Sequence, residues 1–274
     1  MTMIMPLAGL LDKTAAVLRR DLLTTLRYRS GFLMMAASTL AELAAFYYLS
    51  RAIGPGFRPH GMDYFAFLLV GTGFYTFLLM GMNSFLTSVQ EAQQTGTLEV
   101  LMTTATSAPV LIFLSAISAF ARNIMRLLFY LAAGFLLLWN TPLVRPNFSA
   151  CLLVLFLSAL ISISIGIVAA ALHISIQKGS AVIWLLGSGA WFMTGTLFPI
   201  SVLPKPLLVV AKWIPITYSL DGMRLALLQG ANWSMLAREI TILGLFAVVL
   251  LPASLVVFAY TVRHARLEGT LAFY

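Results

Sequence analysis

The residue types that most often carry out chemistry in proteins are sparse and widely separated in this sequence. The three histidines, His60, His173 and His264, lie in different parts of the chain, and the single cysteine is Cys151. This spacing does not form a ligand set of the kind that zinc requires. The sequence also lacks a G-x-x-x-x-G-K-[ST] phosphate loop, an H-E-x-x-H pair and a G-x-S-x-G elbow. We therefore expect no ATPase motif, no cofactor, no metal and no catalytic residue in this chain.

One acidic residue stands where its chemistry would be unusual. Glu42 lies midway along an apolar run, residues 31–53. An ionisable side chain inside a bilayer is costly, and it usually faces the interior of a helix bundle or an aqueous path. Two interpretations are open. Glu42 contributes to a translocation path, or it is a structural partner for a hydroxyl, amide or arginine of a neighbouring helix.

The composition predicts an integral membrane protein. Hydrophobic residues make up 61% of the 274 residues and charged residues 9%, with a mean hydropathy of +0.96. A soluble domain is about half apolar and about a quarter charged. The apolar runs, about 18 to 27 residues long, suit an all-α polytopic protein rather than the alternating strands of a barrel. The net charge of +8 lies mostly beside these runs, which predicts contact with membrane lipids and not with nucleic acid.

Six transmembrane helices are predicted. They cover residues 31–53, 63–89, 123–140, 150–172, 180–199 and 240–262. The third lies within a longer apolar region that contains Arg122 and Arg126. A span that begins at Asn123 lets both arginines extend to the interface, which avoids the cost of a charge at the bilayer centre.

Two further segments are membrane-associated but do not have the pattern of plain spans. Residues 200–233 are too interrupted by prolines for a span and too apolar for a solvated loop, which predicts two short re-entrant helices in the outer leaflet. In residues 7–29, Arg20 and Arg27 fall opposite a leucine stripe and Arg19 lies at its flank. This pattern predicts an N-terminal interfacial amphipathic helix, with a helix packed on a partner as the alternative.

The orientation follows from the basic residues near the span ends. An even number of spans places both termini on one side of the membrane. That side collects the denser set of basic residues: Lys13, Arg19, Arg20, Arg27, Arg29, Arg122, Arg126, Lys178, Arg263 and Arg266. Because basic residues concentrate in cytoplasmic connections, we expect both termini to be cytoplasmic.

The connection after the second span has an unusual composition for the cytoplasmic side. It reads "QEAQQTGTLEVL" over residues 90–101 and contains no Lys or Arg. On a helix that begins at Thr97, one face is apolar and comprises Leu98, Leu101 and Met102. Glu99 lies favourably in the first turn, and Glu91 and Glu99 are able to meet basic groups of a neighbour. The segment is either a docking helix for a protein groove or a plain polar loop with incidental acids.

The order of these elements resembles the permease subunit of type-2 ATP-binding-cassette exporters. This family moves O-antigen polysaccharides, teichoic acids, lipids and drugs outward. The resemblance covers nearly the whole chain and is most specific in "EAQQTGTLEVLMTTATSAP" (91–109) and "GTLFPISVLPKPLLVVAKWIPITYSLDGMR" (195–224). It implies one permease domain, residues 1–274, in the bacterial cytoplasmic (inner) membrane.

The resemblance also implies partners. Residues 91–107 would be the coupling helix that docks on a separate ATPase subunit, which binds ATP and Mg, and a second copy of the permease would complete the membrane part. The substrate would be amphiphilic: a lipid-linked polysaccharide or glycolipid, or a drug or lipid.

Aromatic residues are the remaining candidates for a translocation path. Sugar-exporting relatives line their conduit with aromatic rings, so the resemblance adds Tyr47, Phe74 and Tyr75 to Glu42 as path candidates. Interfacial anchoring and plain packing use the same residue types. An ion-driven carrier or channel without an ATPase is the alternative function. It is disfavoured because Glu42 is the one acid in the interior of the predicted spans and no inverted repeat is visible.

Overall fold

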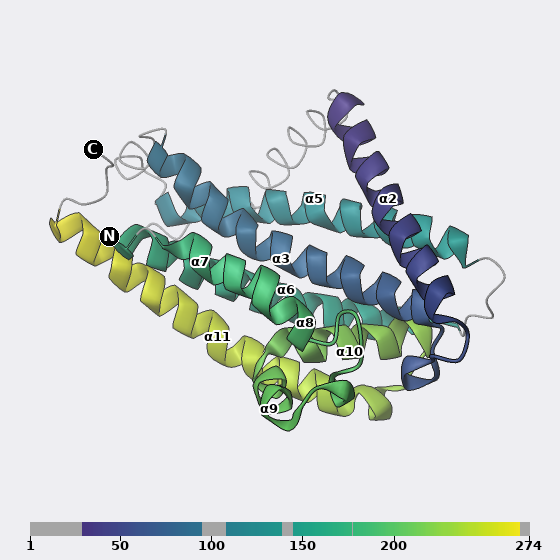
Figure 1. The fold of residues 1–274 in the computed structure, drawn as a ribbon. Helices are drawn as coiled ribbons and strands as arrows, with labels where there is room; N and C mark the ends of the chain where they lie inside the picture. Colours follow the sequence, from purple (N-terminus) through teal and green to yellow (C-terminus); the bar gives the residue numbers. More distant parts are fainter. Residues whose placement is uncertain (1–28, 95–107, 139–144, 177, 269–274) are drawn as a thin grey trace.

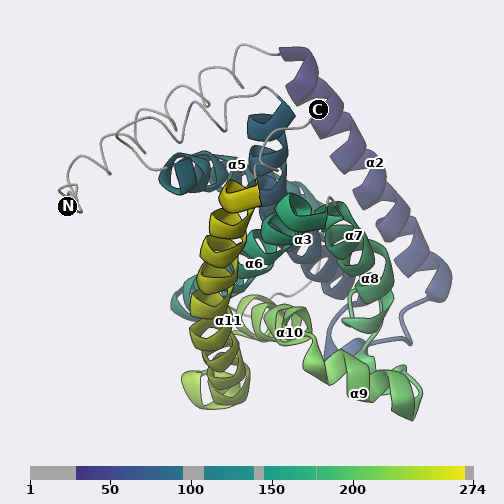
Figure 2. The ribbon, with the colours of Figure 1, turned by 90° about the vertical axis from the view of Figure 1, so that its left-hand side faces the viewer.

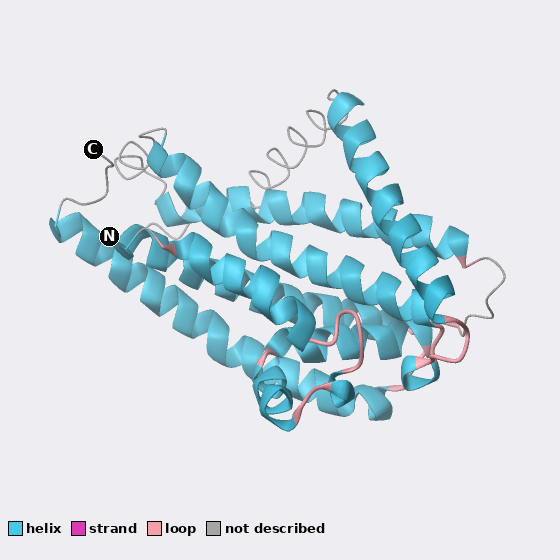
Figure 3. Cartoon of the chain, viewed as in Figure 1, coloured by secondary structure: helices cyan, strands magenta, loops and turns pink. Residues whose placement is uncertain are grey.

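The structure, a computed structural model, describes residues 29–94, 108–138, 145–176 and 178–268. This part of the chain is helical and contains no strand, which confirms the all-α prediction (Figure 3). Five long helices form most of it: α2 (Arg29–Ile53), α3 (Tyr64–Gln94), α5 (Ala108–Leu137), α6 (Phe148–Ile176) and α11 (Trp233–Glu268). The predicted interfacial helix, 7–29, lies outside the described residues except at its last position.

Four helices in the described part are long and apolar enough to cross a membrane. Their apolar segments are Leu33–Ile53, Tyr64–Glu91, Phe148–Ile176 and Trp233–Ala265. They coincide with the first, second, fourth and sixth predicted spans. The other two predicted spans correspond to shorter apolar segments, Asn123–Leu137 and Gly179–Met193.

The third predicted span belongs to a longer helix. α5 runs without interruption from Ala108 to Leu137, so Asn123 and Arg126 lie inside the helix rather than at its start. Polar side chains in a helix leave its backbone hydrogen bonds intact, and residues 110–133 contain no proline or glycine that would break it.

The fifth predicted span is irregular. α7 (Gly179–Trp184) passes into a π-helical turn, Leu185–Gly189, and then into α8 (Ala190–Met193). The helix ends at Met193 and not at residue 199. Gly195 has a φ of +80°, a left-handed conformation that stops a helix, and Pro199 follows without an amide hydrogen.

α3 is the centre of the bundle. In its most apolar 18-residue window 83% of the residues are buried, against 22% for α11 and 11% for α2. Small residues allow the close approach of its neighbours. A Cβ at Gly73 would lie 2.6 Å from the ring of Tyr130 in α5, and a Cβ at Gly166 of α6 would lie 2.6 Å from the carbonyl oxygen of Met82. Neither glycine therefore has room for a side chain.

α2 stands apart from this core. Among its described side chains only Thr39 and Leu43 are buried. In Figure 1 its first turns stand away from the other helices, and its contact with α3 comes from later residues such as Tyr47, whose ring meets that of Phe65. Exposed apolar side chains cover much of its surface: Leu33, Met34, Leu40, Tyr48, Leu49 and Ile53. Such a face suits lipid or a second membrane protein chain.

The proline-rich region 200–233 contains two short helices, α9 (Lys205–Trp213) and α10 (Pro215–Leu228). Each begins with a proline in its first turn, where the missing amide hydrogen costs nothing. Ile214 between them is extended. Both lie at the end of the bundle where α11 begins, and α10 is packed deeply while α9 is largely exposed (Figure 2).

Candidate functional site

Glu42 lies at a small cavity between α2, α3 and α5. The cavity also touches Gly73, Met80, Arg126 and Tyr130 and has a volume of about 20 Å³, enough for about one water molecule. Arg126 carries the opposite charge and interacts electrostatically with Glu42. This places the acid beside an arginine of a neighbouring helix, one of the two settings expected for it.

Polar contacts continue from this cavity along the contact between α3 and α5. Asn123 donates to the hydroxyl of Ser84 at 3.3 Å, and Arg126 donates to the sulfur of Met80 at 3.4 Å. The hydroxyls of Thr72 and Tyr130 are 2.8 Å apart and both are buried. A buried hydroxyl is costly without a partner, so these pairs hold α5 in one register against α3.

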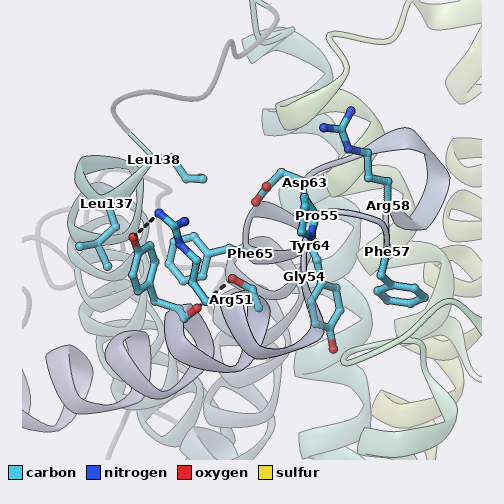
Figure 4. A pocket seen from close by; sticks show the side chains of 12 residues that line it. Arg51, Gly54, Pro55, Phe57, Arg58, Asp63, Tyr64, Phe65, Leu137 and Leu138 are labelled. Carbon is cyan, nitrogen blue, oxygen red and sulfur yellow. Dashed lines mark hydrogen bonds between the residues drawn. The ribbon is translucent and has the colours of Figure 1, made fainter.

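Tyr47 lies at a larger pocket near the end of α2 (Figure 4). This pocket has a volume of about 390 Å³ and is formed by the last turns of α2, the connection to α3, the start of α3 and the end of α5. The ring of Tyr47 meets that of Phe65 edge to face at 5.5 Å. Its hydroxyl accepts a hydrogen bond from Arg51 at 2.9 Å.

Phe74 and Tyr75 lie in the core of this single chain. Their exposed fractions are 1% and 3%, and neither lines the two cavities described above. Phe74 stacks on Phe77 at 5.8 Å, and the hydroxyl of Tyr75 donates to the carbonyl oxygen of Leu186 in the π-helical turn. A π-helix widens the backbone locally and is often found at functional positions. The role of both residues in a translocation path stays a prediction.

The candidate coupling segment is described only at its beginning. Glu91 is exposed on the last turn of α3, and the amide of Gln90 donates to the hydroxyl of Ser180 at the start of α7 at 3.1 Å. The other predicted coupling residues lie outside the described residues: Thr97, Leu98, Glu99, Leu101 and Met102. The predicted interfacial arginines also lie outside them: Arg19, Arg20 and Arg27. The hydrogen bond between Gln90 and Ser180 therefore ties the last turns of α3 to the start of α7.

The most extensive polar contact in the described part is made by Arg224 of α10. Arg224 is 1% exposed, and its guanidinium donates to three backbone carbonyl oxygens: Phe67 at 3.2 Å, Gly195 at 2.9 Å and Thr196 at 2.9 Å. It also lies 3.5 Å from the ring centroid of Phe67 and 3.8 Å from a carboxylate oxygen of Asp221. Arg224 thus joins α10, α3 and the connection after α8.

The charge of Arg224 persists in this environment. A guanidinium stays protonated in proteins even where it is buried, and a carboxylate oxygen of Asp221 lies 3.8 Å from it. The guanidinium is therefore protonated at neutral pH and acts as a donor in all three hydrogen bonds. A buried cation that makes three hydrogen bonds holds its partners firmly, because leaving any of them unpaired is costly.

The sequence prediction did not single out Arg224 or Tyr130. Arg224 is not among the basic residues that define the predicted cytoplasmic side. A usable signal was present, since "SLDGMRLALL" places an arginine in an apolar helix with an acid three residues before it. Tyr130 carries no comparable signal, because its partner Thr72 is distant in sequence.

One comparison with known proteins gives a match. The family model for the ABC-2 type transporter matches residues 12–228. The matched region begins before the described residues, includes α2 to α8 and reaches the end of α10. The comparison with individual curated proteins gives no match.

Proposed function

Because the chain belongs to the ABC-2 type transporter family, we propose that it is the membrane subunit of an exporter driven by a separate ATPase. The family match and the apolar helices make it a multi-pass membrane transport subunit. The proposal adds the energy source, the direction and the cargo. ATP and Mg are bound by the partner subunit, and the cargo is an amphiphile carried outward: a lipid-linked polysaccharide or glycolipid, or a drug or lipid.

The length of the helices supports six crossings. α5 has 30 residues, which corresponds to about 45 Å and exceeds a hydrocarbon core of about 30 Å. Gly179–Met193 is shorter, and its crossing is completed by the connection that Arg224 holds through Gly195 and Thr196. Six crossings leave α9 and α10 as re-entrant helices in the outer leaflet.

The ends of the bundle support cytoplasmic termini. The last turns of α3, α6 and α11 lie at one end (Figure 1), and exposed Lys178 and Arg263 lie there too. This end also leads into the predicted coupling segment, 91–107. A cytoplasmic ATPase would meet the chain at this end, and basic residues favour the same side.

The central position of α3 supports a mechanical role for that segment. α3 carries the most buried residues of the bundle and ends at Gln94, within the predicted coupling segment. The Gln90–Ser180 hydrogen bond links its last turns to α7. A push on residues 95–107 by the ATPase would therefore move two predicted spans together, rather than a single peripheral helix.

The cavities support a conduit between two copies of the chain. The cavity beside Glu42 holds about one water molecule and is too small for an amphiphile. α2 contributes few buried residues and presents an apolar face over most of its length. We therefore propose that a second copy of the permease faces this chain and that the path forms between the two.

Copurification tests the split-subunit arrangement. The tagged chain is expressed in its own host, extracted in mild detergent and analysed for bound proteins. We expect a protein with a Walker motif to copurify in a one-to-one ratio with the permease, and the Leu101→Asp variant to retain less of it while still inserting into the membrane. An undiminished complex with Leu101→Asp would contradict docking through residues 91–107. Substrate transport by a chain that never acquires an ATPase would contradict the proposal as a whole.

A further inference from the structure

The pocket near the end of α2 combines two arginines with aromatic rings in its lining. Arg51 and Arg58 line it, together with Tyr47, Phe57, Tyr64 and Phe65 (Figure 4). The rings are held by their own contacts, since Phe57 meets Tyr64 edge to face at 4.9 Å and Tyr47 meets Phe65 at 5.5 Å. At about 390 Å³ the pocket falls within the range of small-molecule sites.

The charges in this pocket are unbalanced. Arg51 and Arg58 are opposed by one acid, Asp63, and no ion pair joins either arginine to a carboxylate within the described ranges. Asp63 already has a role, because its Oδ1 accepts the backbone N–H of Ala66 at 3.2 Å and caps the start of α3. The lining therefore carries a net positive charge and favours an anion.

Arg51 is oriented before any ligand arrives. Its Nη2 donates to the Tyr47 hydroxyl at 2.9 Å, and its Cζ lies 5.3 Å from the Tyr47 ring centroid. A guanidinium has five N–H donors, so this bond leaves donors free for a ligand. In Figure 4, Arg51 and Arg58 lie on opposite sides of the view with Asp63 between them. Planar guanidinium groups suit phosphate oxygens, which they bind with paired hydrogen bonds.

The surroundings of the pocket favour an amphiphile over a small soluble anion. Exposed apolar residues continue from the pocket along both flanking helices: Tyr48, Leu49 and Ile53 of α2, and Leu136 and Leu137 of α5. An acyl chain would lie against these residues while its headgroup occupies the pocket. We propose that this pocket binds the phosphate of an anionic lipid headgroup, with Arg51 and Arg58 as ligands and the aromatic lining next to the glycerol region.

The proposal does not depend on transport, direction or the ATPase. It requires only the pocket at the end of α2, so it is tested on the purified chain without nucleotide. The probes are phosphatidylglycerol, phosphatidylcholine at the same concentration and acyl-chain length, and inorganic phosphate. Native mass spectrometry counts the lipids retained by the full chain in detergent, and phosphorus NMR line broadening reports binding of inorganic phosphate.

We expect the chain to retain phosphatidylglycerol in preference to phosphatidylcholine. The double variant Arg51→Gln/Arg58→Gln should bind phosphatidylglycerol about tenfold more weakly, the effect expected for the loss of charge-assisted hydrogen bonds. Arg145→Gln is the matched control, because Arg145 is exposed near the same end but does not line the pocket. Arg51→Lys keeps the charge without the planar fork and should give a partial loss, and it replaces the double variant if that variant fails to fold.

The outcomes separate the two sources of phosphate. Preference for phosphatidylglycerol that is lost in the double variant supports the lipid site. Binding of inorganic phosphate that is lost in the double variant, without lipid preference, supports the phosphate site and assigns it to a water-soluble ligand. Equal retention of both lipids with no phosphate binding would overturn the proposal. A folded double variant that binds like the unmodified chain would overturn it as well.

Discussion

Gly71 of α3 and Arg224 of α10 fit together because Gly71 has no side chain. A Cβ built at Gly71 would overlap the Nη2 atom of Arg224 and lie 2.7 Å from the carbonyl oxygen of Thr196. The glycine therefore leaves the space through which the guanidinium reaches the backbone of two separate segments, α3 and the connection after α8. This relationship joins the central helix of the bundle to the proline-rich region that precedes α11.

Replacing Arg224 with alanine should destabilise the chain strongly. The carbonyl oxygens of Phe67, Gly195 and Thr196 would lose their donor inside the protein, and breaking a buried charged contact of this kind costs about 3–5 kcal/mol. The measurement is the thermal unfolding midpoint of the purified chain in detergent. Arg238→Ala, at an exposed position on α11, should leave the midpoint nearly unchanged. An equal effect of both variants would show that Arg224 is not a structural link.

Replacing Gly71 with alanine should also destabilise the chain, because the added methyl group would overlap the side chain of Arg224. Overpacking a filled interior costs about 1–3 kcal/mol. Gly244→Ala is the control, since a Cβ there meets nothing within 4 Å and an added methyl in a helix is favourable. The double variant Gly71→Ala/Arg224→Ala should be less unstable than the sum of the single variants, because the methyl group no longer meets a guanidinium. Strict additivity would contradict the contact.

The long apolar helices at the first, second, fourth and sixth predicted spans followed from the sequence, because length and apolarity are properties of a single segment. The prolines likewise identified a broken region at 200–233, since a proline at the start of a helix is cheap and one in its interior is not. These signals are local, and each is contained in a single segment.

The contacts that join the segments were not predictable in the same way. Arg224 resembles an interfacial arginine when only its neighbours in sequence are considered. Its burial depends on Phe67 and Thr196, which belong to segments distant from it in the chain. The π-helical turn at Leu185–Gly189 is a further example, because its contact with Tyr75 comes from α3. The spacing of apolar and polar residues within 180–199 does not indicate this π-helical turn.

Neutralising Glu42 separates its two interpretations. Glu42→Gln keeps the shape and removes the charge that faces Arg126 across their shared cavity. If Glu42 is a structural partner, the unfolding midpoint falls and the Arg126→Gln variant shows a similar loss. If Glu42 belongs to the path, the midpoint is kept and ATP-driven transport falls. Because the pair lies between helices, we expect the structural effect, and an unchanged midpoint in both variants would contradict it.

Labelling of single cysteines tests the topology of α9 and α10. The background is Cys151→Ser, and a membrane-impermeant thiol reagent is applied to the outside of intact cells. Cysteines at the exposed positions Lys205 and Lys212 should label rapidly, whereas a cysteine at Leu220, which is 0% exposed, should resist. Uniform labelling from 200 to 233 would indicate a solvated loop. Labelling of position 212 from the cytoplasmic side alone would contradict six crossings with cytoplasmic termini.

The central claim is that a separate ATPase drives this chain through residues 91–107. Its most direct test is the rate of ATP hydrolysis in lipid nanodiscs, measured for the chain alone, for the complex with its ATPase subunit and for complexes carrying Glu99→Lys or Leu101→Asp. Arg145→Glu, a charge reversal near the opposite end of the bundle, is the control. We predict no hydrolysis by the chain alone, full hydrolysis by the complex and the control, and hydrolysis that no longer responds to substrate in the two coupling variants. Robust hydrolysis by the chain alone, or unchanged coupling in both variants, would contradict the account.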